Sequence, residues 1–503
     1  MTWILQCVMA LCVWCASVAA FAAVGDTTPQ AWFVRPATIC AVNGDGLGYE
    51  CATTAGGRGA FSGFSNILYS PTTGVDDGDT LYVCGAHATQ LSIAVNGAPM
   101  APIILSGDCP GDRGSINTAG GGALDSAVLL LNVSHIRVSG FAQLTGNRAA
   151  ILVYASSGPM EHITINRNVI DNRLSASTTN VCNGIGFDGT FPHVAMTITH
   201  NTILGTATNC GGTSNNDGIN MIRLTSGLIA WNDISGAEGG IDFDGTLEGV
   251  DVYGNWVHDN RVDGMKAFGG HACPIGPARV QQNLFVNNGN WGAIWQNQHN
   301  SLFADNVIVQ FRDTPQSGSA PYGGLQTEDP TLFTGATCPS ANNTFLGNII
   351  TANWQYGVVT HYSQTRAEFD AGHVWQGNLL YQNGTQTPLV WFGTPLAPTS
   401  QVNEGNYGAW QTAHPGDVNA EPQFVNASAC VSQASVAACQ AADFHLTDTS
   451  QFKNDGPWWG KECVGVNGKV CVPPVRTARF TLTVAPPTAS YTFTGTITGP
   501  ILP

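Results

Sequence analysis

The chain has 503 residues, of which 60 are glycine and only 10% are charged, and its formal net charge at pH 7 is −16. This composition argues against an α-rich fold, because few segments place apolar residues at helical spacing, and it favours many turns and short strands. The acidic balance excludes nucleic acid as a partner, since binding phosphate needs a basic surface, and it disfavours an acidic polysaccharide unless a bound cation bridges the two.

The N-terminus carries an apolar segment, residues 3–22, that ends in small residues. It predicts a secretory signal peptide over 1–22 with cleavage near Ala22, although the usual basic start is missing, and an anchoring helix remains the alternative. No later run is long and apolar enough to cross a membrane. We therefore expect a protein secreted to the periplasm or the medium, monomeric and without a membrane partner once the leader is removed.

Twelve of the 15 cysteines lie beyond the leader, because Cys7, Cys12 and Cys15 are within it. An even set is typical of exported, oxidised proteins. Sequence neighbours give the expected pairs, although spacing alone does not fix the connectivity: Cys40–Cys51, Cys84–Cys109, Cys182–Cys210, Cys273–Cys338, Cys430–Cys439 and Cys463–Cys471. Beyond the leader, no Cys-x-x-Cys motif or Cys/His cluster has the spacing of a structural zinc site.

The first region after the leader, residues 23–125, is expected to form an N-terminal cap and the first coils of a solenoid. Residues 76–85 (Asp-Asp-Gly-Asp-Thr-Leu-Tyr-Val-Cys-Gly) and 101–107 (Ala-Pro-Ile-Ile-Leu-Ser-Gly) are strand-like segments within it. The terminal units of repeat proteins differ from the internal ones, because they must cover the end of the stacked core.

A repeated glycine sets the architecture of the central region, residues 126–425. Successive repeats are 22 to 34 residues long and begin at Gly184, Gly218, Gly240, Gly264, Gly292, Gly324 and Gly357. The residue after each glycine is apolar, whereas the second and fourth are mostly polar and variable. This alternation predicts a strand with one buried face.

A second register consists of asparagines that each follow a short apolar-alternating stretch: Asn168, Asn201, Asn232, Asn255, Asn283, Asn306, Asn348 and Asn378. Asn recurring at one turn is expected to adopt the left-handed conformation and to hydrogen-bond its stacked neighbour. Each repeat then holds about three short strands and cannot bury its own apolar face. Stacked coils can bury their apolar faces against one another, so we predict a right-handed parallel β-helix. The unequal length of the repeats argues against a β-propeller or a β-sandwich.

The repeat fades towards the C-terminus, where residues 426–503 are expected to form a cap and a β-prone tail. Residues 421–426 and 442–447 resemble the closing segments of many β-helix proteins. Residues 475–503 are rich in Thr and Pro and carry no repeat signal, so a covering strand and a loose tail both remain open.

Lys266 is the first lysine of the chain and lies within a repeated strand. The aligned position holds Asn220 and Asp242 in the two preceding repeats, so stacking should bring these side chains about 5 Å apart on one outward face. A lone amine beside acidic residues is a candidate proton-transfer site, and Lys266 is the predicted catalytic residue. A solvated Lys–Asp pair with no catalytic role is the alternative.

Four carboxylates from two neighbouring coils are expected around this amine. Asp242 and Asp244 share its face, and Asp217 and Glu238 stand at the turns that precede their strands. Hard cations such as Ca²⁺ take six to eight oxygen ligands from such groups, with water or substrate filling the remainder. The four are therefore candidate calcium ligands, and a solvated polar face without metal remains open.

Three motifs carry a resemblance to a known family: Asp-Gly-Ile-Asn (217–220), Glu-Gly-Gly-Ile-Asp (238–242) and Asp-Gly-Met-Lys-Ala-Phe-Gly-Gly (263–270). Together they resemble the signature of polysaccharide lyase family nine, the β-helical pectate and exopolygalacturonate lyases. The resemblance implies calcium on Asp217, Glu238 and Asp242 and Lys266 as the base.

This sequence departs from the family pattern at three positions. Gly239 stands where the family has a second Asp, Glu238 replaces the first Asp, and Asp263 replaces a Gly before the lysine strand. Loss of one carboxylate weakens the expected calcium site, and Asp244 is a candidate substitute.

The predicted reaction is cleavage of a uronate polysaccharide by β-elimination, in which a base removes the proton next to the carboxylate. Calcium on that carboxylate would stabilise the developing charge and would lower the pKa of Lys266, whereas Asp242 alone would raise it. The residues assigned to substrate binding are Asn220, Arg223, Arg261 and Asp263, although solvated surface is the favoured interpretation for the two arginines.

Two alternatives remain. Asn-Asn-Asp-Gly (215–218) resembles the Asn-Thr-Asp of polygalacturonases, which hydrolyse with paired carboxylates, but the Asp-Asp and Gly-His-Gly expected after it are missing. A non-catalytic exported adhesin or carbohydrate-binding β-helix is the other alternative, since this scaffold serves unrelated functions.

Overall fold

The computed structural model describes residues 28–70, 73–93, 95–118, 124–174, 182–205, 216–268, 276–296, 298–309, 323–328, 340–351, 353, 356–361, 372–381, 390–393, 402–404, 407–426, 443–447, 477–484 and 491–498. The predicted leader lies outside these residues, as do the predicted pairs Cys273–Cys338, Cys430–Cys439 and Cys463–Cys471 and the predicted partner of Cys182.

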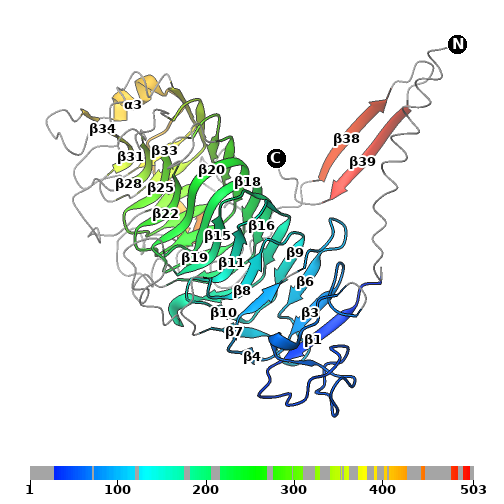
Figure 1. Ribbon diagram of the computed structural model, residues 1–503. Helices are drawn as coiled ribbons and strands as arrows, with labels where there is room; N and C mark the ends of the chain where they lie inside the picture. The colour runs from blue at the N-terminus through cyan, green and yellow to red at the C-terminus, as the bar shows by residue number, and fades with distance from the viewer. Residues whose placement is uncertain are drawn as a thin grey trace.

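The chain forms a right-handed parallel β-helix, as the repeats predicted, and its coils stack along one axis (Figure 1). Each coil contributes a strand to a first sheet, one to a second sheet and a short one to a third sheet. The first and second sheets form a single 24-stranded hydrogen-bonded network, because β18 and β20 run through both, and the third is a separate 11-stranded sheet.

The first sheet presents the outward face discussed below. Its strands are β5 (Leu91–Ile93), β8 (Ser126–Leu131), β11 (Ala149–Ala155), β15 (Asn183–Gly189), β18 (Ile219–Ala230), β20 (Gly239–Tyr253), β22 (Asp263–Phe268), β25 (Trp291–Gln296), β28 (Gly323–Glu328), β31 (Tyr356–His361) and β34 (Val390–Gly393), closed by the antiparallel β35 (Val402–Glu404).

The second sheet contains β1 (Ala31–Arg35), β2 (Phe61–Ser62), β3 (Thr80–Val83), β6 (Ile103–Ser106), β9 (Ile136–Ser139), β12 (Met160–Glu161), β13 (Ile163–Asn166), β16 (His193–Thr199), the later parts of β18 and β20, β23 (Ala278–Gln281), β26 (Leu302–Ala304), β29 (Asn343–Leu346) and β32 (His373–Gln376).

The third sheet contains β4 (Ala86–His87), β7 (Ser115–Asn117), β10 (Gln143–Thr145), β14 (Val169–Asp171), β17 (Thr202–Leu204), β19 (Asp233–Ser235), β21 (Trp256–His258), β24 (Leu284–Val286), β27 (Val307–Val309), β30 (Ile349–Thr351) and β33 (Leu379–Tyr381). Two short 3₁₀ helices, η1 (Phe64–Asn66) and η2 (Asn172–Leu174), lie outside the sheets.

The apolar residue after each repeated glycine points into the core. These residues stack in register through successive first-sheet strands and are fully buried: Ile185, Ile219, Ile241, Met265, Ala293, Leu325 and Val358. Burial of each large member contributes about 1.5–3 kcal/mol relative to exposure. The preceding glycine is required by packing, because a Cβ at Gly240 would collide with Val257 of the third sheet and with the Gly264 carbonyl.

The asparagine register forms a continuous hydrogen-bonded ladder between the second and third sheets. From Asn168 to Asn348, each Nδ2 donates to the Oδ1 of the next asparagine at 2.9–3.0 Å, and Asn378 donates to Asp417. The stacking prediction is confirmed, but the left-handed residue is the one before each asparagine, for example His200 and Trp231. That residue makes the turn, and the asparagine side chain is left to link the coils.

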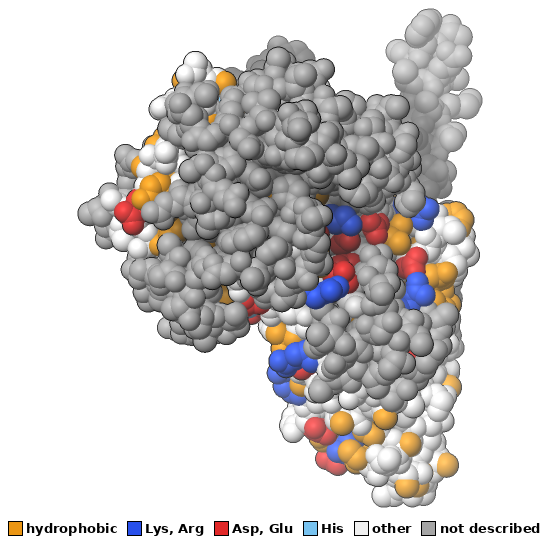
Figure 2. All heavy atoms as spheres, turned by 90° about the vertical axis from the view of Figure 1, so that its left-hand side faces the viewer, with side chains coloured by type: hydrophobic (Ala, Val, Ile, Leu, Met, Phe, Trp, Pro, Cys, Tyr) orange, Lys and Arg blue, Asp and Glu red, His pale blue; other side chains and the backbone are white. Residues whose placement is uncertain are grey.

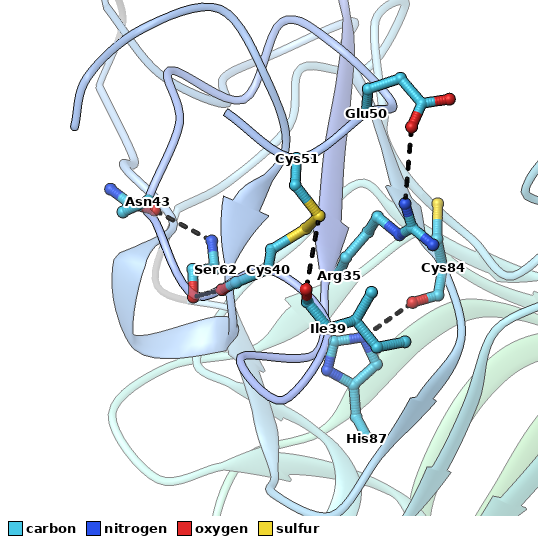
Figure 3. Close-up of a disulfide and its surroundings, with 9 residues drawn as sticks. All are labelled: Arg35, Ile39, Cys40, Asn43, Glu50, Cys51, Ser62, Cys84 and His87. Carbon is cyan, nitrogen blue, oxygen red and sulfur yellow. Dashed lines mark hydrogen bonds and ion pairs between the residues drawn. A yellow bond between two sulfur atoms is a disulfide. The ribbon is translucent and has the colours of Figure 1, made fainter. Parts of the chain in front are cut away.

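The N-terminal region confirms two of the predicted disulfides, Cys40–Cys51 and Cys84–Cys109. Figure 3 shows Cys40–Cys51 joining a loop that is also held by Asn43, whose Oδ1 accepts a hydrogen bond from Ser62 N at 2.9 Å. The loop lies beside β1, whose strand partners include β3.

The C-terminal residues leave the coil pattern. Helix α3 (Tyr407–Ala413) carries Trp410, which is fully buried and donates from Nε1 to Asp417 Oδ2 at 2.9 Å, so the last ladder residue is tied to the closing helix. The two predicted closing segments pair with each other as antiparallel β36 (Phe424–Asn426) and β37 (Asp443–Leu446). In the predicted tail, β38 (Thr477–Val484) and β39 (Tyr491–Thr498) form an antiparallel hairpin.

Membrane-spanning character is not found in the described helices, none of which combines sufficient length with sufficient apolarity.

A buried histidine on the third sheet predicts a pH dependence of stability. His258 stacks on Trp256 and contacts two carboxylates, with Nε2 3.0 Å from Asp233 Oδ1 and Nδ1 2.8 Å from Asp259 Oδ2. Burial alone would lower the pKa of His258, but these carboxylates outweigh it and raise the pKa above its ordinary value. The stabilisation is therefore complete below the unfolded-state pKa, about 6.5, and is lost as pH rises through the higher folded-state pKa.

The measurement is the melting temperature of the wild type and of His258→Gln across this range. The destabilisation caused by the substitution should be larger at pH 5.5 than at pH 9. An equal difference at both values would contradict a charged His258.

Candidate active site on the first sheet

Lys266 lies on the outward face of the first sheet, in the register that the sequence predicted. Asn220 pairs with Asp242 across β18 and β20, and Asp242 pairs with Lys266 across β20 and β22. The amine Nζ is 3.7 Å from Asp242 Oδ2, and the side chains are 28% and 6% exposed. An amine and a carboxylate thus share a partly buried position that solvent still reaches from the lysine side.

Asp217 stands beside this pair at the turn before β18 and is buried. Both of its carboxylate oxygens accept hydrogen bonds: Oδ1 from Gly239 N and Oδ2 from Asn220 Nδ2, each at 3.1 Å. The carboxylate therefore fixes the start of β20 and the orientation of Asn220.

Gly239 has a direct structural explanation. A Cβ at this position would lie 2.6 Å from Asp217 Oδ1, so the Asp expected there by family resemblance would displace Asp217. Asp263 is the register partner of Gly239 one coil further on. An acidic side chain absent from one coil is thus present in the same column of the next.

The buried carboxyl groups bind protons more tightly than usual. Burial raises the pKa of Asp242 to about 7 and that of Asp263 to about 7, although Lys266 opposes both shifts. Burial, and after it the charge of Asp242, raises the pKa of Asp217 well above its usual range. Buried acids this close cannot all be ionised without a compensating cation.

The ammonium form of Lys266 is stabilised by the same cluster. Burial on its own would lower the pKa of Lys266, but the charges of Asp242, Asp263, Asp244 and Asp217 outweigh it and raise the pKa above its ordinary value. The free protein therefore holds Lys266 as an ammonium, and the amine can act as a base only after those negative charges are neutralised.

Of the remaining predicted residues, Glu238 and Arg261 form an ion pair of 2.8 Å at the edge of this cluster, half-buried. Asp244 is two residues beyond Asp242 on the same strand and is close enough to raise the pKa of both Asp242 and Lys266. Arg223 lies at the irregularity of β18 between Ile222 and Leu224, is exposed, and donates to the Gly189 carbonyl at 2.7 Å. The Arg223 guanidinium is therefore hydrogen-bonded to the coil turn, whereas the other predicted residues lie around Lys266.

The chemistry of the donors fits a hard cation only in part. No three His, Cys, Asp or Glu side chains of the described segments already lie close enough together to hold a metal. Yet Asp242 Oδ1, Asp263 Oδ1 and Glu238 Oε2 are buried and accept no hydrogen bond. Oxygens without a donor, on carboxyl groups with raised pKa values, are suited to a divalent cation that brings water or substrate ligands with it.

Two tryptophans of β25, next to the cluster, do not present their rings to solvent. Trp295 is fully buried in the core, and Trp291, 5% exposed, is buried beside Asp263. The sequence also gave no reason to select Arg148, which pairs with Asp188 on β15. The one sequence feature that points to this ion pair is the polar fourth position after the repeated glycine, which Asp188 occupies.

Figure 2 shows acidic and basic side chains lying next to each other on one face of the molecule. Five carboxyl groups surround one amine and one guanidinium in the cluster just described (Asp217, Glu238, Asp242, Asp244, Asp263, Lys266 and Arg261). The cluster therefore contains more acidic than basic groups, as does the whole chain.

The family comparison agrees with the fold. The model of the family described as "Right handed beta helix region" matches residues 126–308. No curated protein sequence matches the chain significantly. Among solved structures, an alginate lyase from Paenibacillus sp. str. FPU-7 is similar at 12% identity, covering 73% of this chain and 98% of that one, with a TM-score of 0.43.

Two further solved structures are similar to this chain. Pectate lyase Pel9A is 12% identical over 84% of this chain and 91% of that one, with a TM-score of 0.42. The A-module of the mannuronan C-5 epimerase AlgE6 from Azotobacter vinelandii is 17% identical over 69% of this chain and 92% of that one, also with a TM-score of 0.42.

Proposed function

We propose that this protein is an exported polysaccharide lyase, similar to family nine, that cleaves a uronate-containing polysaccharide by calcium-assisted β-elimination. The observation that supports it is the position of Lys266: an outward-facing amine, 3.7 Å from Asp242, at the centre of buried carboxyl groups. A purely structural salt bridge would not need the additional acids Asp217 and Asp263, which stay buried at the cost of raised pKa values.

In the proposed reaction, neutral Lys266 takes the proton from C5 of the uronate, beside its carboxylate. The electron pair left on C5 forms the C4–C5 double bond, and the glycosidic oxygen on C4 departs with its electrons. A bound calcium ion would supply a counter-charge for the substrate carboxylate and would neutralise the carboxylates that raise the pKa of Lys266.

The protein's own residues then have separate tasks. The candidate cation ligands are Asp217, Glu238, Asp242 and Asp244. Asn220 lies in the same column as the amine and can orient a sugar hydroxyl. Arg261, which pairs with Glu238 of the cluster, is the candidate guanidinium for a second carboxylate. Asp263 is also assigned to the substrate, and Arg223 would have to release its hydrogen bond to the Gly189 carbonyl to join it.

The test is incubation of the full-length mature protein with polygalacturonate, alginate and other uronates, with calcium or with chelator, while the ultraviolet absorbance of the unsaturated product is recorded. A calcium-dependent increase supports the proposal. A saturated reducing end would instead indicate a polygalacturonase-like hydrolase. No product from any uronate, together with no calcium binding, would favour a non-catalytic adhesin or carbohydrate-binding protein.

Calcium affinity should depend on pH in a defined direction. Asp242 and Asp263 have pKa values of about 7, so both are partly protonated near neutrality and a cation must displace those protons. Affinity should rise from pH 6 to pH 8, by up to about tenfold per pH unit for each proton displaced. Titration calorimetry in buffers of different ionisation enthalpy measures the calcium affinity and the number of protons released on binding. An affinity independent of pH would contradict the prediction.

A further inference from the structure

We propose that Asp263, and not Asp217, supplies the second carboxylate of the cation site, together with Asp242. This inference rests on the proposed function, because it concerns the cation that the lyase would use. It exchanges the roles of two residues: Asp217 becomes a positioning residue, and Asp263 becomes the ligand that Gly239 cannot provide.

Asp217 already satisfies its oxygens within the protein. Its Oδ1 accepts from Gly239 N and its Oδ2 from Asn220 Nδ2, and its own backbone N–H donates to Asn183 Oδ1 at 3.0 Å. These contacts link three successive coils. A cation bound directly to this carboxylate would have to weaken the hydrogen bonds that fix the start of β20.

Asp263 is in the opposite situation. It is 6% exposed, and its Oδ1 accepts no hydrogen bond in the described part of the chain. The charges of Lys266, Asp242 and Glu238 act on its carboxyl group, which therefore lies within electrostatic range of the same cluster. Asp242, 4% exposed, likewise has an Oδ1 without a donor.

The strand register explains why the proposed ligand is one coil further along than the Asp that the family pattern places at position 239. Gly239 and Asp263 are direct partners across β20 and β22, and a side chain at 239 is excluded by Asp217 Oδ1. A carboxylate at 263 occupies the same column about 4.8 Å further along the axis and remains next to Lys266. Two carboxylates leave most of the coordination positions of Ca²⁺ to water and to the substrate.

The experiment uses Tb³⁺ as a luminescent substitute for Ca²⁺ on the full-length protein. Trp291 is the register partner of Asp263 across β22 and β25, so indole excitation should sensitise Tb³⁺ bound at Asp263. Asp263→Asn should weaken Tb³⁺ and Ca²⁺ binding by about tenfold or more, because a charged ligand is lost. Asp217→Asn keeps an Oδ1 acceptor for Gly239 and should change affinity by less than about threefold.

Thermal unfolding gives a readout that a merely structural role would not produce. In chelator, Asp263→Asn should melt no lower than the wild type, since it removes a buried charge from a cluster of like charges. In calcium, the wild type, Asp217→Asn and the control Asp251→Asn should gain stability with rising concentration, whereas Asp263→Asn should not. Asp251→Asn is the matched control, because Asp251 pairs with Arg279 at 2.6 Å on the second sheet.

Several outcomes overturn the inference: unchanged binding in Asp263→Asn, loss confined to Asp217→Asn, or no binding of either ion by the wild type. The lyase assay on the same preparations separates these results from failure of the proposed function. Unchanged ion binding in Asp263→Asn with an active wild type rejects the ligand assignment alone, whereas an inactive wild type on every uronate rejects the lyase.

Discussion

Lys266→Ala is expected to lower the elimination rate by about 10²- to 10⁴-fold, the range over which a positioned general base contributes. The reason is geometric, since Lys266 is the cationic side chain in register with Asn220 and Asp242 on the outward face. The measurement is the initial rate of unsaturated product formation at saturating calcium on the best uronate found.

Two companion variants make this result specific. Lys266→Arg preserves the positive charge but cannot lose a proton near neutral pH, so it should be as inactive as Lys266→Ala if the amine is the base. An active Lys266→Arg would show that charge alone is required. Arg279→Ala removes a more exposed ion pair, on the second sheet, and should keep nearly full activity.

A consequence for the cation follows from the same substitution. The ammonium of Lys266 occupies the field of the carboxylates in the free protein and competes electrostatically with any other cation there. Lys266→Ala should therefore bind calcium more tightly while being inactive. A fully active Lys266→Ala would remove the basis of the proposed mechanism.

The coil architecture was predictable because two separate sequence patterns, the repeated glycine and the repeated asparagine, both follow it. The glycine before each core residue and the asparagine at the later turn recur through the central coils, so they align strands that are 22 to 42 residues apart. That alignment also gave the column Asn220–Asp242–Lys266, since register in stacked coils determines which side chains are neighbours. The chain ends lack both registers, and their pairing could not be derived in the same way.

The details of the site depend on side-chain contacts that cannot be predicted from the spacing of residues in the sequence. That Gly239 must be glycine follows from the orientation of the Asp217 carboxylate, which is known only once Gly239 N is seen to donate to it. Burial of Trp291 beside Asp263 was likewise hidden, because position −1 of the repeat has no fixed polarity in the sequence. The left-handed residue before each ladder asparagine was misassigned by one position, since either residue of such a turn can adopt that conformation.

Asn255→Ala is expected to have the largest effect on stability. Asn255 is fully buried in the middle of the ladder, where its Oδ1 accepts from Asn232 N and Nδ2 and its Nδ2 donates to Asn283 Oδ1 and the Ile229 carbonyl. Alanine removes all four hydrogen bonds and leaves Asn232 N without its acceptor, whereas Asn283 Oδ1 keeps only the bond from the backbone N–H of residue 255. Each group that is left unpaired where water cannot reach it costs about 1–3 kcal/mol. The free energy of unfolding should fall by about 3–5 kcal/mol.

Urea unfolding of the full-length protein measures this loss, and Asn117→Ala is the control. Asn117 is exposed at the end of β7, so its replacement should change the free energy by less than about 0.5 kcal/mol. Similar losses for the two variants would mean that the ladder adds nothing beyond ordinary turn preference.

The ladder's last residue explains why asparagine is required at internal positions. Asp417 only accepts, from Asn378 Nδ2 and Trp410 Nε1, and has no further asparagine to which it must donate. At position 255 the same carboxylate would face Asn283 Oδ1, an acceptor, and would bury an unpaired charge. Asn255→Asp should therefore destabilise the protein at least as much as Asn255→Ala at pH 8 and less at pH 5, where protonation restores a donor. A pH-independent loss in Asn255→Asp would show that donation along the ladder is not what stabilises the coils.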